Sequence, residues 1–273
     1  MSRKALRITL VLLLVVPSVF GGGVWGDEAK RLRVCADPNN LPFSNEKQEG
    51  FENRIAELTA KALGANLSYY WWPHERGLVR NTLGADRCDV IIGIPKEYER
   101  VLSTKPYYRT GYVIAYLKDR NFHITSLDDP ILNKLRIGVL SNTPPHMALA
   151  ERGILGDNLV QYSLYHYDWD QPEQLGKPVK DLLSGKSDIA LLWGPIVGYY
   201  VKKHAVSSLV LVPLKGGDPR LPMSFDMAMG VKRGNKELKV QLDEVLTKKQ
   251  AEITHILEEY GVPLFPAQAS AGS

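Results

Sequence analysis

The sequence predicts an α/β protein whose two lobes are joined by two crossing segments. Short apolar runs typical of strands alternate with amphipathic helices from residue 31 to residue 260, which is the pattern of α/β folds. The alternation starts afresh near Leu135, and the last strand and helices find no partner in this second series. The chain is therefore expected to leave a first lobe, build a second one and return.

The first series opens with a strand at 31–36 that ends in the turn-forming run Asp37-Pro-Asn-Asn40. A helix is predicted over 50–63, because apolar residues recur there at helical spacing and Gly64 follows. The other expected elements of this series are strands at 65–72, 88–94 and 111–117 and a short helix at 76–83.

The second series begins with a strand at 135–140, a turn at 141–145 and a helix at 145–151 with proline near its first turn. The further expected strands are 159–167, 188–192, 209–214 and 227–231, and the further helices are 179–183, 195–203 and 235–260, the last with a break near Lys248.

These elements divide the chain into a first lobe, residues 27–115 plus 228–273, and a second lobe, residues 116–227. Chain crossings near 116–118 and 225–229 would form a hinge. Ligands of open α/β sheets lie beyond the carboxyl ends of the strands, so the expected site is a cleft between the lobes.

Residues 1–26 are expected to be a cleavable signal peptide. They carry three basic residues and no acid, followed by a 13-residue apolar run that is too short to span a membrane. Without this leader the chain has 31 basic and 30 acidic residues, which does not favour nucleic acid or a membrane as partner. We expect an exported, periplasmic protein with no anchor after cleavage.

The chain contains two cysteines, Cys35 and Cys88. This number excludes zinc ribbons and iron–sulfur clusters, which need four ligands. An even pair in an exported chain favours one disulfide, and two buried free thiols are the alternative.

Several motifs resemble the type II periplasmic solute-binding proteins of the amino-acid-binding family. They occur in order along nearly the whole chain: Gly50-Phe-Glu-Asn53, Asp89-Val-Ile-Ile-Gly93, Lys105-Pro-Tyr-Tyr108, Gly185-Lys-Ser-Asp188 and Met229-Gly-Val-Lys-Arg-Gly-Asn235. The resemblance implies the two-lobed type II fold. It also implies that the strands with Cys35 and Cys88 are neighbours, although their parallel offset could separate the two residues.

A narrower resemblance is to the quinoprotein dehydrogenase-associated branch, the MoxJ/XoxJ type. It rests on runs that begin at Val34, Trp71, Val79 and Lys105. This branch is implied to serve a PQQ-dependent methanol or alcohol dehydrogenase in its maturation or activation. The alternative is a solute receptor that delivers a small molecule other than an amino acid to an ABC transporter.

The chain departs from the devices by which the amino-acid-binding family holds its ligand. The expected carboxylate clamp is Arg100, in a shortened segment, and the hydrogen-bonding turn is Ser141-Asn142-Thr143. Trp193 falls where the family places its amine-binding Asp. These departures argue against a free amino acid as ligand. The alternative interpretations are a solvated Arg100, a Thr143 that only caps a helix and a Trp193 packed in the core of the second lobe.

The remaining expected cleft residues are polar groups near the first strand ends and aromatic residues that suit an apolar segment. They are Asp37, Asn39, Phe43, Trp72, Arg76 and Tyr108. For Phe43, Trp72, Tyr108 and Trp193 the alternative is ordinary core packing.

No catalytic signature is present in the sequence, so an enzyme is not expected. A metal site at His166, Asp168 and Asp170 is a weak alternative, since such a loop is usually solvated. We expect a monomer that needs no cofactor and binds a dehydrogenase segment, with a small molecule as a further possible ligand.

Overall fold

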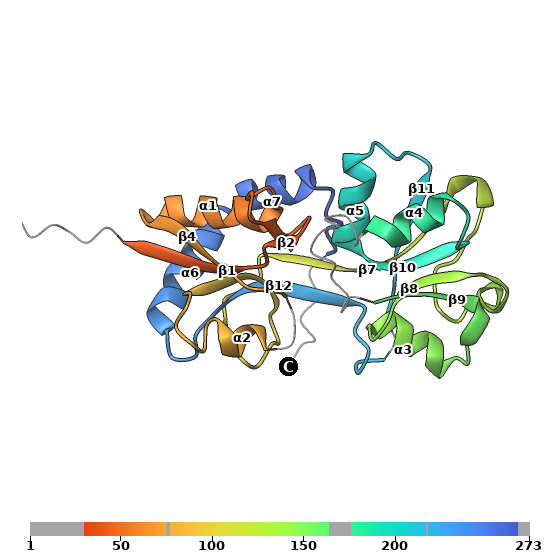
Figure 1. Ribbon diagram of the computed structural model, residues 1–273, viewed down its shortest axis with the longest axis horizontal. Helices are drawn as coiled ribbons and strands as arrows, with labels where there is room; N and C mark the ends of the chain where they lie inside the picture. The colour runs from red at the N-terminus through yellow and green to blue at the C-terminus, as the bar shows by residue number, and fades with distance from the viewer. Residues whose placement is uncertain (1–29, 75–76, 164–175, 217, 267–273) are drawn as a thin grey trace, which may run out of the picture.

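The structure is a computed structural model that describes residues 30–74, 77–163, 176–216 and 218–266. The expected leader, Arg76 and the weak metal alternative at 166–170 lie outside these residues. Figure 1 shows two α/β lobes side by side, with strands β7 (Tyr108–Leu117) and β12 (Ser224–Val231) running from one to the other. The predicted α/β class and two-lobed architecture are confirmed.

Strands β1 (Arg31–Ala36), β4 (Asn66–Trp71) and β5 (Val90–Pro95) form the parallel part of the first lobe, in the order β4-β1-β5. Strand β12 then pairs antiparallel with β5. Short strands complete this lobe: β2 (Asn39–Asn40), β3 (Ser44–Asn45) and β6 (Leu102–Ser103). Its helices are α1 (Phe51–Leu63), α2 (Leu78–Asn81), α6 (Lys236–Lys248) and α7 (Gln250–Glu259).

The second lobe repeats this order. Strands β8 (Ile137–Leu140), β9 (Leu159–Tyr162) and β10 (Ile189–Trp193) run parallel as β9-β8-β10, and β7 pairs antiparallel with β10 and with β11 (Leu209–Pro213). The helices are α3 (Pro144–Glu151), α4 (Lys177–Leu183) and α5 (Gly194–Lys203), with 3₁₀ turns at Lys118–Arg120, Pro130–Lys134 and Gly156–Asn158.

The C-terminal helices share the core of the first lobe. Leu242 and Leu246 of α6 and Leu257 of α7 are buried in one cluster with Phe51 and Ile55 of α1. This is the packing that the unpaired C-terminal elements predict. The break between α6 and α7 falls at Lys249, one residue from the expected position.

Strand β7 changes partner earlier than expected. Its residues 108–111 pair with β12, whereas Tyr112 already pairs with Trp193 of β10. Residues 113–116 are buried in the clusters of the second lobe. The crossing thus lies at Gly111 and Tyr112 rather than at 116–118, because one long strand serves both sheets. The full residue boundaries of the lobes stay a prediction.

A third segment bridges the lobes after α7. The hydroxyl of Thr110 donates to the carbonyl of Pro263 at 2.7 Å, and the amide of Phe265 donates to the carbonyl of Arg109 at 2.8 Å. Gly198 of α5 needs its lack of a side chain here, since a Cβ would lie 1.9 Å from the carbonyl oxygen of Gly261. The C-terminal segment therefore runs along the crossing strands and contacts both lobes.

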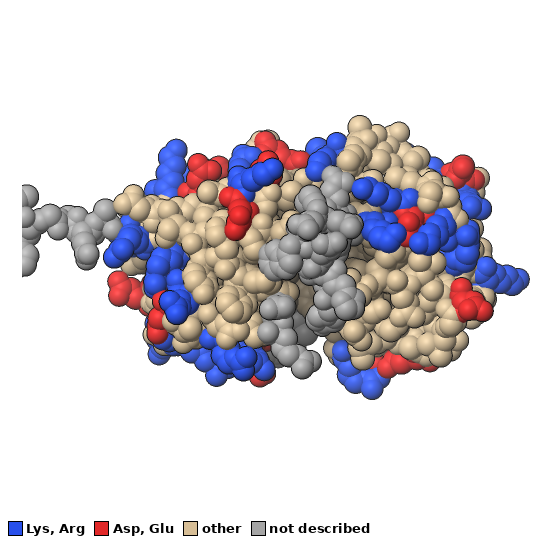
Figure 2. Space-filling view, viewed as in Figure 1, with Lys and Arg blue, Asp and Glu red and all other residues tan. Residues whose placement is uncertain are grey.

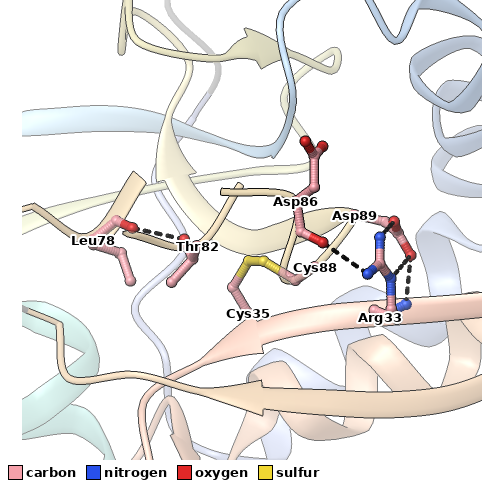
Figure 3. The surroundings of a disulfide bond; sticks show 7 residues. All are labelled: Arg33, Cys35, Leu78, Thr82, Asp86, Cys88 and Asp89. Carbon is pink, nitrogen blue, oxygen red and sulfur yellow. Dashed lines mark hydrogen bonds and ion pairs between the residues drawn. A yellow bond between two sulfur atoms is a disulfide. The ribbon is translucent and has the colours of Figure 1, made fainter. Parts of the chain in front are cut away.

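A disulfide joins Cys35 and Cys88, as predicted, with 5.5 Å between their Cα atoms. Cys35 pairs with Ile91 in the β1–β5 ladder, so Cys88 lies outside β5, in the turn before it. The amide of Asp89 donates to the carbonyl of Arg33 and folds this turn back over β1. Figure 3 shows the disulfide beside the ion pair of Arg33 and Asp89. The parallel offset of β1 and β5 therefore does not separate the two cysteines, because the turn brings Cys88 back beside Cys35.

Candidate functional site

The loop after β1 is fastened by Asp37. Its carboxylate accepts the amide of Asn39 at 2.8 Å and the amide of His74 at 2.5 Å. The amide of Asp37 in turn bonds the hydroxyl of Ser44 at 3.1 Å. Asn39 lies on β2 and pairs with Asn45 of β3. Asp37 thus ties the loop after β1 to the one after β4, at the carboxyl ends of both strands.

Three of the predicted aromatic residues gather at the edge of the first core. Phe43 packs against Phe51 with ring centroids 5.2 Å apart, and Tyr108 meets Phe51 edge-on at 6.4 Å. Trp193, which precedes α5 of the second lobe, also packs against this first core. The structure therefore brings Phe43, Tyr108 and Trp193 to one region, where the lobes meet.

Two aromatic residues of the crossing strands join them, and neither could be singled out from the sequence. Trp193 lies edge-on to Phe225 of β12 at 5.7 Å and to Tyr112 of β7 at 5.1 Å. All three are only partly buried. We call Phe43, Tyr108, Tyr112, Trp193 and Phe225 the junction aromatics. Trp193 is thus placed against the hinge strands and the first core, not inside the core of the second lobe.

Trp72 lies apart from this set. It stacks on Tyr70, which packs against the buried cluster around Cys35 and Cys88, whereas Tyr69 and Trp71 pack against the first core. Because side chains alternate along a strand, Trp72 continues the face opposite to the junction aromatics. Its indole N–H is buried without a hydrogen-bond partner.

The turn Ser141-Asn142-Thr143 lies directly before α3, and the capping hydrogen bond of the alternative interpretation is not formed. Thr143 is buried at the N-cap position, yet its hydroxyl donates to the carbonyl of Leu140 at 2.7 Å instead of capping the helix. Asn142 is exposed with φ 61°, and the hydroxyl of Ser141 bonds Gln161 at 3.1 Å. Pro144 and Pro145 occupy the start of α3, so this helix end offers fewer amide donors than usual.

Arg100 is exposed and lies two residues before β6. Strand β6 pairs with Gly230 and Val231, at the end of β12 that is farthest from the crossing. The structure therefore does not bring Arg100 to the junction aromatics. Arg76 lies outside the described residues.

Sequence reasoning missed one charged group, Glu52, the second residue of α1. Burial raises its pKa to about 8, and the nearby Asp37 adds to the shift. A Cβ at Gly93 would lie 1.9 Å from Oε1 of Glu52, so the carboxyl rests on the bare backbone of β5. The signal available in the sequence was Gly93 itself, because glycine in a strand often marks a close approach.

Comparison with known proteins places the chain in a family. Residues 32–263 match the bacterial extracellular solute-binding proteins, family 3. The chain belongs to this family. It is 35% identical over 251 residues to the protein MoxJ of Methylorubrum extorquens, which covers 88% of this chain and 83% of MoxJ.

Solved structures agree with this assignment. The crystal structure of the periplasmic binding protein XoxJ from Methylobacterium extorquens has a TM-score of 0.72 and 37% identity, over 86% of this chain and 100% of XoxJ. The crystal structure of MxaJ from Methlophaga aminisulfidivorans has a TM-score of 0.71 and 28% identity, again over 86% of this chain and 100% of MxaJ. Within family 3, the chain is a binding protein of the MoxJ/XoxJ type.

None of the helices in the described residues is long and apolar enough to cross a membrane. In the same residues, no group of three or more His, Cys, Asp or Glu side chains is arranged to hold a metal ion.

Proposed function

We propose that this protein is a periplasmic accessory factor of a PQQ-dependent methanol or alcohol dehydrogenase, which it binds, matures or activates. Its similarity to MoxJ and XoxJ supports this proposal, since the dehydrogenase-associated branch that the chain resembles is the MoxJ/XoxJ type. The region where the lobes meet would receive a segment of the enzyme. After removal of residues 1–26, the chain would act as a monomer in the periplasm.

The observation that carries the proposal is the setting of Trp193. A receptor for free amino acids needs an acid for the ammonium group, and the position expected to supply it holds an indole packed on Phe225 and Tyr112. Deleting the carboxylate from a desolvated charge pair costs about 2–5 kcal/mol. The hydroxyl of Thr143 is turned back to Leu140, and Arg100 lies away from the crossing. The amine-binding acid, the hydrogen-bonding turn and the carboxylate clamp that would hold a free amino acid are thus replaced, turned away or displaced.

The junction aromatics suit an apolar protein segment. They come from both lobes and both crossing strands; four of them are partly exposed, and Tyr108 is buried. Aromatic side chains contribute large contact areas at low entropic cost.

The test is a calorimetric titration of the mature chain, residues 27–273, with the purified dehydrogenase and separately with each common L-amino acid. We expect binding of the dehydrogenase in the micromolar range and no heat with the amino acids. Trp193→Asp should weaken the complex at least tenfold, whereas Trp193→Phe should keep most of the affinity. Leu155→Asp, at an exposed position of the second lobe, controls for the added charge.

A solute receptor for a small molecule other than an amino acid is the second candidate. The match to the extracellular solute-binding family over residues 32–263 favours it. Tight binding of a small molecule, together with no interaction with the dehydrogenase, would replace the first proposal with this one.

A further inference from the structure

The segment that follows α7, residues 261–266, starts from a fixed point in the first lobe. The amide of Val262 donates to the carbonyl of Leu257 at 2.9 Å. The amide of Gly261 donates to the carbonyl of Glu258 at 3.0 Å, and Gly261 has the left-handed φ of 70° that this kind of helix ending favours. Val262 is buried in the core of the first lobe. We call residues 261–266 the strap.

The start of the strap lies directly on α5 of the second lobe, beside which the chain runs after α7 in Figure 1. A Cβ at Gly198 would lie 1.9 Å from the carbonyl oxygen of Gly261, and a Cβ at Gly261 would lie 2.5 Å from the carbonyl oxygen of Gly198. The two backbones are therefore in contact with no side chain between them. Next to this contact Tyr260 stacks on Tyr199 of α5, with ring centroids 6.0 Å apart. Such close packing leaves α5 little room to slide past the end of α7.

The rest of the strap is bonded to the crossing strand β7. The hydroxyl of Thr110 donates to the carbonyl of Pro263 at 2.7 Å, and the amide of Phe265 donates to the carbonyl of Arg109 at 2.8 Å. The side chain of Phe265 packs against a buried cluster of the second lobe. Proline at 263 and at 266 fixes φ and so limits the conformations that the strap can adopt when it is released.

The strap also borders the junction aromatics. A Cβ at Gly194, the residue after Trp193, would lie 3.1 Å from Cγ of Pro263. A Cβ at Gly111, where β7 passes from one lobe to the other, would lie 2.7 Å from Cε2 of Phe265. The strap therefore packs against both the crossing and the start of α5, directly after Trp193.

The two crossing strands are tied to each other at the same level. Nη1 of Arg109 lies 2.9 Å from Oδ1 of Asp226, and Nη2 donates to the hydroxyl of Ser224 at 2.8 Å. The side chains of Arg109 and Asp226 are only 14% and 23% exposed. Hinge motions are absorbed by a few residues where the chain passes between domains, and here these residues are held by side chains as well as by the β-ladder.

We propose that the strap holds the two lobes at one relative angle in the free protein. Closure of two lobes on a ligand requires one lobe to rotate about the crossing strands. That rotation would have to break the contact between Gly198 and Gly261 and the two hydrogen bonds from the strap to β7. The junction aromatics would thus form a preassembled surface instead of two halves that meet on binding. The inference goes beyond the proposed function and is tested without the dehydrogenase.

The experiment measures the distance between the lobes in the mature chain, residues 27–273, by double electron–electron resonance. Charged residues are scattered over both lobes in Figure 2. Two exposed ones are replaced to carry nitroxide labels, by Lys61→Cys in α1 and Asp157→Cys in the second lobe. Cys35 and Cys88 are joined in a disulfide, so only the new thiols react. We expect a single narrow distribution of distances, and a broad or two-peaked one in the full chain would overturn the proposal.

Removal of the strap should release the lobes. A chain that ends at Tyr260 is expected to lose the narrow distribution and to show a broad one. A chain that ends at Pro266 keeps every contact of the strap and should match the full chain. Because Val262 belongs to the first core, Gly198→Ala serves as a second variant that leaves this residue in place. Its methyl group displaces Gly261 from α5, and the distribution should broaden.

A milder variant, Thr110→Val, removes the hydroxyl that holds Pro263 and keeps the shape of the side chain. Thr59→Val is its matched control, since Thr59 is equally buried and its hydroxyl donates to the carbonyl of Ile55 at 2.7 Å within α1. Thr110→Val should broaden the distribution, and Thr59→Val should not. An unchanged distribution in the chain that ends at Tyr260 overturns the proposal. If that chain does not fold, unchanged distributions in both Gly198→Ala and Thr110→Val overturn it, as does equal broadening by Thr59→Val and Thr110→Val.

Discussion

The two lobes contain the same Arg–Asp pair at the same place in their sheets. In the first lobe the amide of Arg33 donates to Oδ2 of Asp89 at 2.9 Å, and its guanidinium Nη2 lies 2.7 Å from Oδ1. In the second, Arg136 meets Asp188 with distances of 2.9 and 2.8 Å between the same atoms. Each pair joins the start of the first parallel strand to the turn before the third, so both lobes hold this turn electrostatically.

The lobes differ at the neighbouring positions. Cys35 and Cys88, two residues after Arg33 and one before Asp89, form the disulfide. Gly138 and Ser187 hold the equivalent positions beside Arg136 and Asp188, and the buried hydroxyl of Ser187 has no hydrogen-bond partner. The comparison shows that only the first lobe, which carries Glu52 and Tyr108, has its turn fixed by a covalent bond. In the second lobe the equivalent turn is held by the Arg136–Asp188 pair without a disulfide.

The largest expected effect is the loss of the disulfide. Replacing Cys35 and Cys88 by alanine should lower the free energy of unfolding by about 4 kcal/mol, because a cross-link over 53 residues restricts the unfolded chain by that amount. Urea unfolding followed by tryptophan fluorescence measures it. Ser187→Ala at the equivalent position of the second lobe is the control, with an expected change below about 1 kcal/mol. Equal effects of the two changes would remove the contrast between the lobes.

A second disulfide should make the lobes alike. A Cβ at Gly138 would lie 3.4 Å from Oγ of Ser187, so Gly138→Cys with Ser187→Cys is expected to form a cross-link. The gain should be about 2 kcal/mol, below that of the natural bond, since the same Cβ would crowd Ala190 at 3.3 Å. Thiol titration of the unfolded, unreduced protein should detect no free thiols. Two free thiols would show that the turns differ in shape, not only in residue type.

Breaking the Arg–Asp pairs should have the smallest effect, about 1–2 kcal/mol for Asp89→Asn or Asp188→Asn, since both arginine side chains are partly exposed. Asp157→Asn, at an exposed residue, is the control. The disulfide should soften the loss in the first lobe, because the turn stays attached to β1. A larger loss for Asp89→Asn than for Asp188→Asn would contradict that expectation. Urea unfolding at pH 7 measures both.

The pair of the second lobe should also show a pH dependence. The hydrogen bonds from Arg136 hold the pKa of Asp188 below its usual value. A depressed folded-state pKa stabilises the protein above the unfolded value of about 3.9, and this stabilisation is lost as the pH falls below it. The difference between wild type and Asp188→Asn should therefore shrink below about pH 4. An unchanged difference at pH 3 would argue against the ion pair as its source.

Most secondary structure could be predicted from the sequence, because its causes are local. The helix α1 ends at Leu63, where Gly64 adopts the left-handed conformation with φ 63°, as the glycine after an apolar helical pattern predicts. The break between α6 and α7 and the restart of the pattern at β8 were equally visible. The short strands β2, β3 and β6 were missed, since two-residue pairings leave no periodicity to detect.

The positions of the disulfide, the strand crossing and the site residues depended on contacts between segments that are distant in the sequence. The sequence alone determined the α/β class, the two βα series, the return of the C-terminal helices and the one possible cysteine pair. Only the tertiary structure decided that Cys88 reaches Cys35 from the turn before β5, that β7 changes partner at Gly111, and that Arg100 lies away from the junction. It alone revealed the Glu52 carboxyl on Gly93 and the buried, unpaired hydroxyl of Tyr108. Periodicity records which face of an element is buried, but the burial and charge of a side chain depend on residues far along the chain that folding brings beside it.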